Sequence, residues 1–210
     1  VVDALTNSRT PATTPSAVLG PFYVDGPPET SQGADLAAGL PGIPLWTDVR
    51  VTDTNDVAVP DAVVDVWQSN EDGFYDVQLP DVDGPVLRAR FRTDADGRLR
   101  FWTIVPSEYP IPADGPVGQM LDAVGRHPYR APHIHFMIAK PGFRTLITQL
   151  FVRGGRYLDS DTVFGVKEAL IVDFTEQTGP PPDGREVEHW RRLDFTFRVL
   201  QNPNTGRADG

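Results

Sequence analysis

The sequence predicts an all-β protein, a β-sandwich with long irregular connections and little helix. Segments of alternating apolar and polar residues recur along the chain, turn residues separate them, and helical periodicity is rare. Strands are expected at residues 48–53, 62–67, 87–93, 98–105, 133–138, 146–152 and 193–200. Several short strands joined by turns are typical of two packed antiparallel sheets.

The first residues do not follow this strand pattern. Residues 1–14 are expected to be the remnant of an N-terminal helical segment and a linker, because the start is helix-like, lacks an initiator Met and runs into Pro, Ser and Thr. The arm at 17–45 contains repeated Pro and Gly without periodicity, and such long connections are often functional. The sandwich is expected over residues 15–200 and a C-terminal tail over 201–210.

Two connections between the strands have a predicted form. Asp94-Ala95-Asp96-Gly97 reads as a turn, so the strands on either side of it are expected to form a hairpin. Residues 163–170 are expected to be one short helical turn or a loop. Helix is therefore expected to be a minor component of the fold.

Composition restricts the classes of function. The net charge of -10 argues against nucleic acid or an anionic membrane as a partner. No apolar run approaches the roughly 18 to 20 residues of a membrane helix, and no signal-peptide pattern is present, so a cytoplasmic location is expected. The absence of cysteine excludes disulfides and thiolate metal sites, which leaves nitrogen and oxygen ligands.

A pair of histidines is the first candidate site. His133 and His135 begin an apolar strand-like run, and residues two apart in a strand share one face. Both imidazoles should therefore lie on one side, with Ile134 and Phe136 on the other. Converging imidazoles suit Fe, Zn, Cu or Ni. The alternative at this point is two half-buried histidines that bond to their neighbours.

Two tyrosines follow predicted strand ends. Tyr75 lies shortly after the strand at 62–67, and Tyr109 lies shortly after the strand at 98–105. A tyrosine is often an ordinary packed ring with a satisfied hydroxyl. Loops at the end of a rigid sandwich, however, are where functional groups tend to be presented.

Several motifs together resemble the intradiol ring-cleavage dioxygenases. They are Gly73-Phe74-Tyr75 after a Val-Trp-Gln strand, Ile104-Val105-Pro106-Ser107 followed by Tyr109, Gly125-Arg126-His127, the run from Arg130 to Phe136, and Thr148-Gln149. The resemblance covers about residues 15–200 in motif order and spacing. It implies a catalytic β-sandwich over that range.

The resemblance implies one Fe(III) per chain, held by Tyr75, Tyr109, His133 and His135. Phenolate is a hard anionic donor, so two tyrosinates favour the ferric state. The substrate would be a small aromatic diol or triol that reacts with O2. The resemblance also implies that Tyr109 leaves when the substrate chelates and takes up a proton, whereas Tyr75 stays bound.

Two further residues acquire roles from the resemblance. Arg130 would stabilise negative charge that develops on the ring, and its alternative is a surface salt bridge. Gln149 would form hydrogen bonds to the residues that bind the metal and so support the site. Its alternative is a polar residue on an exposed strand face.

The substrate pocket is similar to that of the hydroxyquinol 1,2-dioxygenase branch. Its expected walls are Val18, Gly20, Pro21, Phe22, Ile111, Pro112 and Val163. Catechol or a chlorocatechol is the alternative substrate, because one pocket methyl group changes discrimination by only about 1 to 3 kcal/mol. In the family a preceding helical segment builds a homodimer and holds a lipid, so both are expected only where that segment is present.

Two other classes of function remain open on the sequence alone. A non-catalytic binding module of the transthyretin type would not need two tyrosines and two histidines to converge. A zinc or copper enzyme would use His133 and His135 with a carboxylate and leave both tyrosines free.

Overall fold

The computed structural model describes residues 12–37, 39–80, 82 and 84–202, so the expected N-terminal remnant and the C-terminal tail lie almost entirely outside the described residues. The elements, in order, are β1 Pro44–Thr52, β2 Val63–Gln68, the 3-10 turn Asp76–Gln78, β3 Arg88–Arg92, β4 Arg98–Ile104, β5 Tyr109–Pro110, α2 Pro116–Ala123, β6 Tyr129–Arg130, β7 His133–Ala139, β8 Leu146–Val152, the 3-10 turn Glu168–Leu170, β9 Ile171–Val172, β10 Thr175–Thr178 and β11 His189–Arg198.

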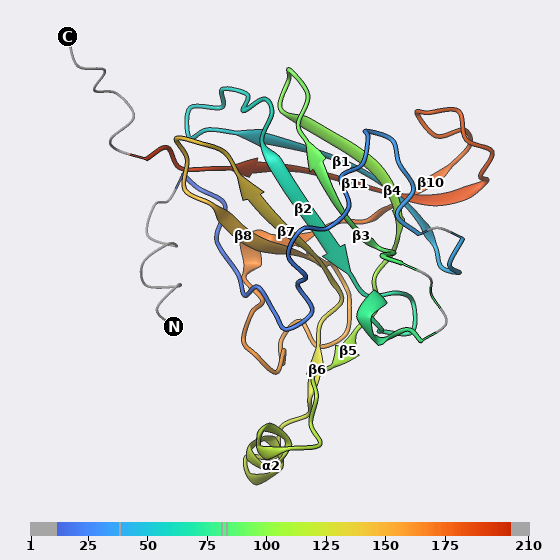
Figure 1. The fold of residues 1–210 in the computed structure, drawn as a ribbon. Helices are drawn as coiled ribbons and strands as arrows, with labels where there is room; N and C mark the ends of the chain where they lie inside the picture. Colours follow the sequence, from blue (N-terminus) through green and yellow to red (C-terminus); the bar gives the residue numbers. More distant parts are fainter. Residues whose placement is uncertain (1–11, 38, 81, 83, 203–210) are drawn as a thin grey trace.

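Two sheets pack face to face, as predicted for a sandwich. One has the strand order β3-β2-β7-β8-β9 and the other has the order β10-β11-β1-β4, and a small third sheet joins β5 to β6 (Figure 1). Antiparallel pairs predominate, but β1 and β11 run parallel, as do β8 and β9. The expected strands are all present, and helix is confined to α2 and the two 3-10 turns in the described part of the chain.

The core lies between the two sheets, where alternate residues of each strand meet. Buried members include Val49, Val51, Val64, Val66, Phe91, Phe101, Ile134, Phe136, Leu150 and Phe197. Each such side chain contributes about 1.5 to 3 kcal/mol by leaving water. Since every second residue of a strand faces the core, the residues between them face outward or under a covering loop.

The predicted hairpin around Asp94–Gly97 is wrong. The turn itself forms, with the Asp94 amide donating to the Arg98 carbonyl at 2.9 Å, but β3 pairs with β2 and β4 pairs with β1. The chain therefore crosses from one sheet to the other at this turn. The physical reason is the core, because Phe91 and Phe101 stack across it with ring centroids 5.1 Å apart.

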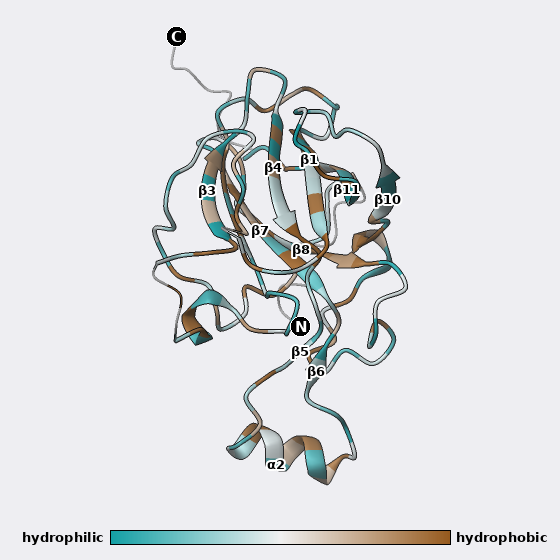
Figure 2. Cartoon of the chain, turned by 90° about the vertical axis from the view of Figure 1, so that its right-hand side faces the viewer, coloured by the Kyte–Doolittle hydropathy of each residue, from teal (hydrophilic) through white to brown (hydrophobic). Residues whose placement is uncertain are grey.

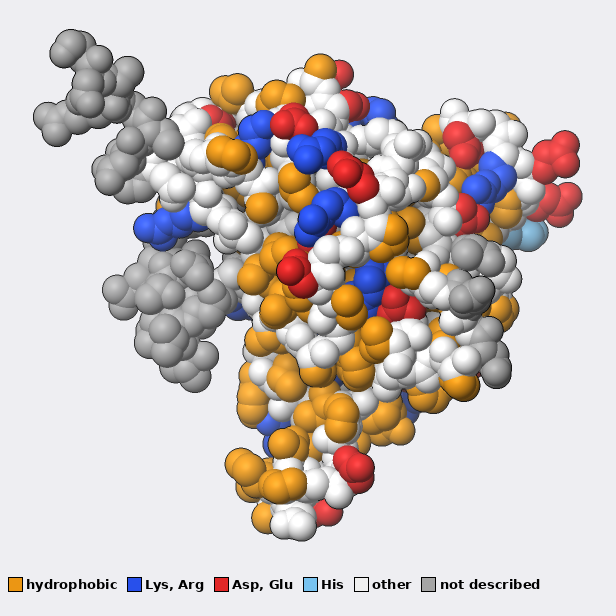
Figure 3. Space-filling view, in the orientation of Figure 1, with side chains coloured by type: hydrophobic (Ala, Val, Ile, Leu, Met, Phe, Trp, Pro, Cys, Tyr) orange, Lys and Arg blue, Asp and Glu red, His pale blue; other side chains and the backbone are white. Residues whose placement is uncertain are grey.

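Helix α2 and strand β10 have no counterpart among the predicted elements. Helix α2 has only eight residues, begins with Pro116 after the N-cap Gly115, and projects from the sandwich beyond β5 and β6 (Figures 1 and 2). Figure 3 shows hydrophobic side chains over this lower region and interleaved acidic and basic side chains over the upper part of the same face. Nowhere in the described residues is there a helix long and apolar enough to cross a membrane.

Candidate metal centre

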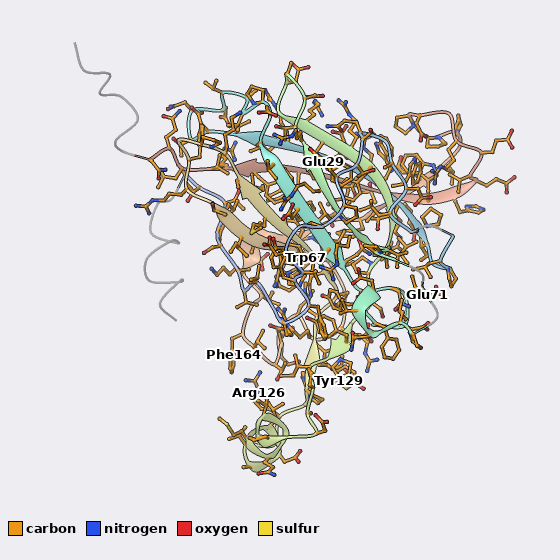
Figure 4. All side chains as sticks on the ribbon, in the orientation of Figure 1. Glu29, Trp67, Glu71, Arg126, Tyr129 and Phe164 are labelled. Atoms are coloured by element: carbon orange, nitrogen blue, oxygen red, sulfur yellow. The ribbon has the colours of Figure 1, made fainter. Side chains whose placement is uncertain are left out.

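A row of side chains crosses the outer face of the five-stranded sheet. The strand register pairs Trp67 of β2 with His135 of β7, and His135 with Gln149 of β8. On the far side of β2, Trp67 pairs with Arg88 of β3. Residues paired directly across strands point to the same face. The row therefore places four polar or aromatic side chains side by side on a rigid support, with Trp67 near the centre of Figure 4.

The two histidines lie on this outer face, as their spacing predicts. His133 and His135 are each 1% exposed, whereas Ile134 and Phe136 lie in the core. The Nε2 atoms of the two rings are 3.0 Å apart. The Trp67 ring stacks on His135 with centroids 4.6 Å apart and planes 13° apart, which fixes the orientation of that imidazole.

Neighbouring groups determine which histidine nitrogens face each other. His133 Nδ1 contacts the Ala131 carbonyl, so its proton lies on Nδ1 and its Nε2 is an acceptor. The Gln149 amide donates to the Val18 carbonyl at 2.7 Å and lies 3.2 Å from His135 Nδ1, so the His135 proton lies on Nε2. A metal ion bound to both Nε2 atoms would displace that one proton.

Both histidines are neutral at pH 7. Burial lowers the pKa of His133 well below its ordinary value, and the charge of Arg130 lowers it further. Burial is also the main cause of the lowered pKa of His135, followed by the influence of His133. Neutral imidazole is the form of histidine that binds a metal.

The two tyrosines meet the histidines, as the motif resemblance implies. Tyr75 and Tyr109 are 0% and 1% exposed, and their rings pack edge to face with centroids 5.1 Å apart. The Tyr75 ring lies 6.2 Å from that of His135, and the Tyr109 ring lies 5.6 Å from that of His133. The four rings, which come from three separate segments of the chain, therefore lie next to one another.

A glycine allows the two tyrosine segments to approach each other. Gly73 has a φ of +85°, which favours glycine, and a Cβ there would lie 2.6 Å from the Glu108 carbonyl oxygen and 3.2 Å from Tyr109 Cβ. Any side chain at position 73 would separate the Tyr75 loop from β5.

The tyrosine hydroxyls fit a metal ion. Both are buried and have no hydrogen-bond partner, a state that costs roughly 1 to 3 kcal/mol for each group. Burial, followed by the nearby Tyr109, raises the pKa of Tyr75 well above its ordinary value. A cation that accepts phenolate oxygens would remove both penalties, and two phenolates with two imidazoles form a hard donor set suited to ferric iron.

A zinc or copper site with a carboxylate finds no support. In the described ranges, no group of three or more His, Cys, Asp or Glu side chains is placed so that it could hold a metal ion. A metal at the two histidines would therefore depend on the tyrosine oxygens.

Arg130, at the end of β6, contacts the histidine pair. It is 2% exposed, so the surface salt bridge that was its alternative is excluded. Its guanidinium bonds Asp161 at 3.1 Å and the Gln149 side-chain oxygen at 3.0 Å, and Nη1 lies 3.3 Å from His133 Nε2. Burial acts to lower the pKa of Arg130, but the charges of Tyr109 and Asp161 outweigh it, so the pKa is raised and the cation is retained.

The predicted pocket residues divide into two groups. Phe22 and Ile111 pack against the tyrosine pair, Gly20 lies so near His135 that a Cβ would be 3.3 Å from Cε1, and Val163 is half-buried beside the loop that bonds Arg130. Val18, Pro21 and Pro112 are exposed, and the Val18 carbonyl accepts a hydrogen bond from the Gln149 amide.

The sequence pattern did not point to Trp67 or Asp161 as part of the site. Trp67 could have been found from its place in a strand that precedes Tyr75. Asp161 gives no local signal for the site, because its contacts there, Arg130 and the Ala131 amide, are 31 and 30 residues away.

Comparisons with known proteins show which family the chain resembles. A family model described as "Dioxygenase" matches residues 18–195. Hydroxyquinol 1,2-dioxygenase of Nocardioides simplex is 48% identical over 195 residues, which are 91% of this chain and 66% of the relative. Hydroxyquinol 1,2-dioxygenase of Rhodococcus opacus is 49% identical over 199 residues, again 91% of this chain and 65% of the relative.

Solved structures show the same similarity. The crystal structure of hydroxyquinol 1,2-dioxygenase from Pseudomonas putida DLL-E4 superposes with a TM-score of 0.88 at 40% identity, covering 96% of this chain and 71% of that one. Catechol 1,2-dioxygenase from Pseudomonas arvilla C-1 gives a TM-score of 0.86 at 32% identity, covering 99% and 71%. This chain thus spans just under two thirds of the length of the two hydroxyquinol 1,2-dioxygenases from Nocardioides and Rhodococcus. The chain belongs to the intradiol ring-cleavage dioxygenase family.

Proposed function

We propose that this protein binds one ferric iron per chain and cleaves hydroxyquinol (1,2,4-trihydroxybenzene) between its adjacent hydroxyl-bearing carbons, with O2 as the co-substrate. The iron ligands are Tyr75, Tyr109, His133 and His135. The observation that carries the proposal is the convergence of two buried tyrosine hydroxyls without partners on two neutral histidines. When bound, ferric iron would acidify a chelating catechol and prepare its ring for reaction with O2.

Tyr109 is the residue that we assign to proton transfer. It lies on the two-residue strand β5, at the end of a loop, whereas the Tyr75 loop is anchored by a buried ion pair at Asp76. Tyr109 therefore has the freer attachment of the two. On release from the metal its phenolate would accept a proton from the substrate hydroxyl.

Arg130 supplies a fixed positive charge beside the substrate. Its guanidinium is held by Asp161 and Gln149, so no reorganisation is needed when negative charge develops on the ring. Gln149 in turn contacts His135 and the arm carbonyl of Val18, so one amide couples the cation, a ligand and the pocket wall.

The substrate assignment rests on the relatives and on the pocket. The curated relatives at 47 to 49% identity carry the name hydroxyquinol 1,2-dioxygenase. The apolar walls Phe22 and Ile111 suit an aromatic ring, and the seven predicted wall positions contain no cation for the carboxylate of protocatechuate. Catechol and chlorocatechol are the second candidates, because relatives with those names are 41% and 39% identical.

Steady-state oxygen uptake by the iron-loaded chain tests the proposal. We expect kcat/KM to be highest for hydroxyquinol, lower for catechol and 4-chlorocatechol by something like tenfold per altered contact, and lowest for protocatechuate. The product from hydroxyquinol should be 3-hydroxy-cis,cis-muconate, which is equivalent to maleylacetate. A clear preference for catechol would overturn the substrate assignment, and the absence of ring cleavage on all four would overturn the proposed reaction.

A further inference from the structure

Arg88 is a buried cation in the row of side chains that carries the candidate site, and the proposed chemistry does not use it. It begins β3, and its side chain is 3% exposed. The register places it beside Trp67, which stacks on His135. A buried guanidinium needs a structural or functional reason, because removing this ion from water is expensive.

The contacts of Arg88 join segments that are far apart in the sequence. Nε and Nη2 form a fork onto the two carboxylate oxygens of Asp76 at 2.8 and 2.6 Å, and Nη2 also donates to the Phe22 carbonyl at 2.7 Å. Asp76 directly follows the ligand candidate Tyr75 in the chain. The Phe22 ring stacks on the Tyr75 ring with centroids 4.5 Å apart and planes 20° apart.

These contacts decide where the Tyr75 hydroxyl lies. The hydroxyl itself has no hydrogen-bond partner, so no hydrogen bond at the tip of the side chain sets its position. Two contacts set the position at the base of the residue: the ion pair of Asp76, and the hydrogen bond that the Tyr75 backbone amide donates to the Gln78 side chain. A third contact, the stacked Phe22 ring, sets the position along the Tyr75 ring. Arg88 holds two of these three constraints at once.

From this geometry we infer that Arg88 is a positioning residue for the metal centre. Through the Asp76 carboxylate and the Phe22 carbonyl it locks the Tyr75 ring between the ligand loop and the arm, and so fixes the phenolate oxygen for the metal. The inference rests on the proposed iron site. The positioning role requires a fork of parallel donors, which lysine cannot supply, because lysine has a single compact ammonium.

The test compares Arg88→Lys with Arg90→Lys. Arg90 lies two residues along the same strand and forms the same kind of fork, onto Asp65 at 2.6 and 2.7 Å, but Asp65 is not adjacent to a ligand candidate. Both variants keep their charge and lose a fork. Each variant of the whole chain is loaded with ferric iron, and its iron affinity is measured by competition with nitrilotriacetate. The maximum of the tyrosinate-to-iron absorption band is recorded in the same samples.

For Arg88→Lys we expect iron affinity to fall by about 10- to 100-fold and the absorption maximum to move. For Arg90→Lys we expect both to match the unmodified protein, although thermal stability can fall in either variant. A purely structural role for Arg88 would lower the stability of Arg88→Lys but leave its iron affinity and absorption maximum unchanged, and that result overturns the inference. An unmodified protein that binds no iron would instead overturn the proposed metal centre itself.

A second variant provides the test if Arg88→Lys does not fold. The pair Arg88→Met with Asp76→Leu removes both buried charges together, which is tolerated better than the loss of one partner. This double variant should fold by circular dichroism and still show weakened iron binding with a shifted band. Iron affinity equal to that of the unmodified protein in the folded double variant overturns the inference.

Discussion

A single methyl group at position 165 should displace the arginine of the site. The backbone of Gly165 lies outside the left-handed region, so alanine suits the backbone conformation there. Its Cβ, however, would lie 2.6 Å from Arg130 Nη2 and 3.3 Å from Asp161 Oδ2. The Gly165 amide donates to the same Asp161 oxygen at 2.7 Å, which ties the loop down, so the guanidinium is the group that must move.

The magnitude follows from these distances. A contact of 2.6 Å is about 0.8 Å shorter than the 3.4 Å of an ordinary contact. A displacement of Nη2 by that distance is large enough to disturb its 3.0 Å bond to Gln149. A misplacement of about 1 Å can cost on the order of 100-fold in rate. We therefore expect Gly165→Ala to lower kcat/KM by roughly 10- to 100-fold, or about 1.4 to 2.7 kcal/mol.

Oxygen uptake with hydroxyquinol measures this effect, and metal analysis with the visible spectrum shows that the iron is retained. Gly115→Ala is the matched control, because a Cβ at Gly115 meets no atom within 4 Å. The control should keep its activity. If Gly165→Ala were folded, iron-loaded and as active as the control, the role given to Arg130 would be refuted.

Three further predictions follow from neighbouring contacts. Arg130→Ala should retain iron and the absorption band but lose turnover by roughly 10²- to 10³-fold, and loss of iron in this variant would make Arg130 structural. Asp161→Asn should lower the free energy of unfolding in urea by roughly 3 to 5 kcal/mol, because it leaves a buried guanidinium without its counter-charge. Tyr23 has its pKa raised to about 12, by burial and then by its hydrogen bond to Asp65, so the stability it adds is complete below pH 10 and is lost as the pH rises through 12. The test is the ultraviolet phenolate titration of the unmodified protein, from which the titration curve of Tyr23→Phe is subtracted. The difference curve should show a step near pH 12, and a step near the ordinary value of 10.0 would contradict the prediction.

Period-two alternation was sufficient to predict part of the fold and of the site. It located the strands, and it placed His133 and His135 on one face of β7 with Phe136 on the other. The convergence of Tyr75 and Tyr109 on that face came from motif resemblance, because no local pattern specifies how two loops meet.

The failures have physical causes as well. The turn at 94–97 has the local bonds of a hairpin, yet packing of Phe91 against Phe101 across the core sends the two strands into different sheets. Helix α2 is too short for its periodicity to stand out. Arg88 and Asp161 act through partners that are distant in sequence, so composition and spacing carry no trace of them.

The central claim is that two tyrosinates and two histidines hold ferric iron. Its most direct test is the visible spectrum of the iron-loaded chain, with metal analysis, beside that of Tyr75→Phe. We predict one iron per chain, a tyrosinate-to-iron absorption band that colours the protein burgundy, and loss of most of the iron and the band in Tyr75→Phe. A colourless protein, or a spectrum unchanged by Tyr75→Phe, would contradict the assignment of the metal centre.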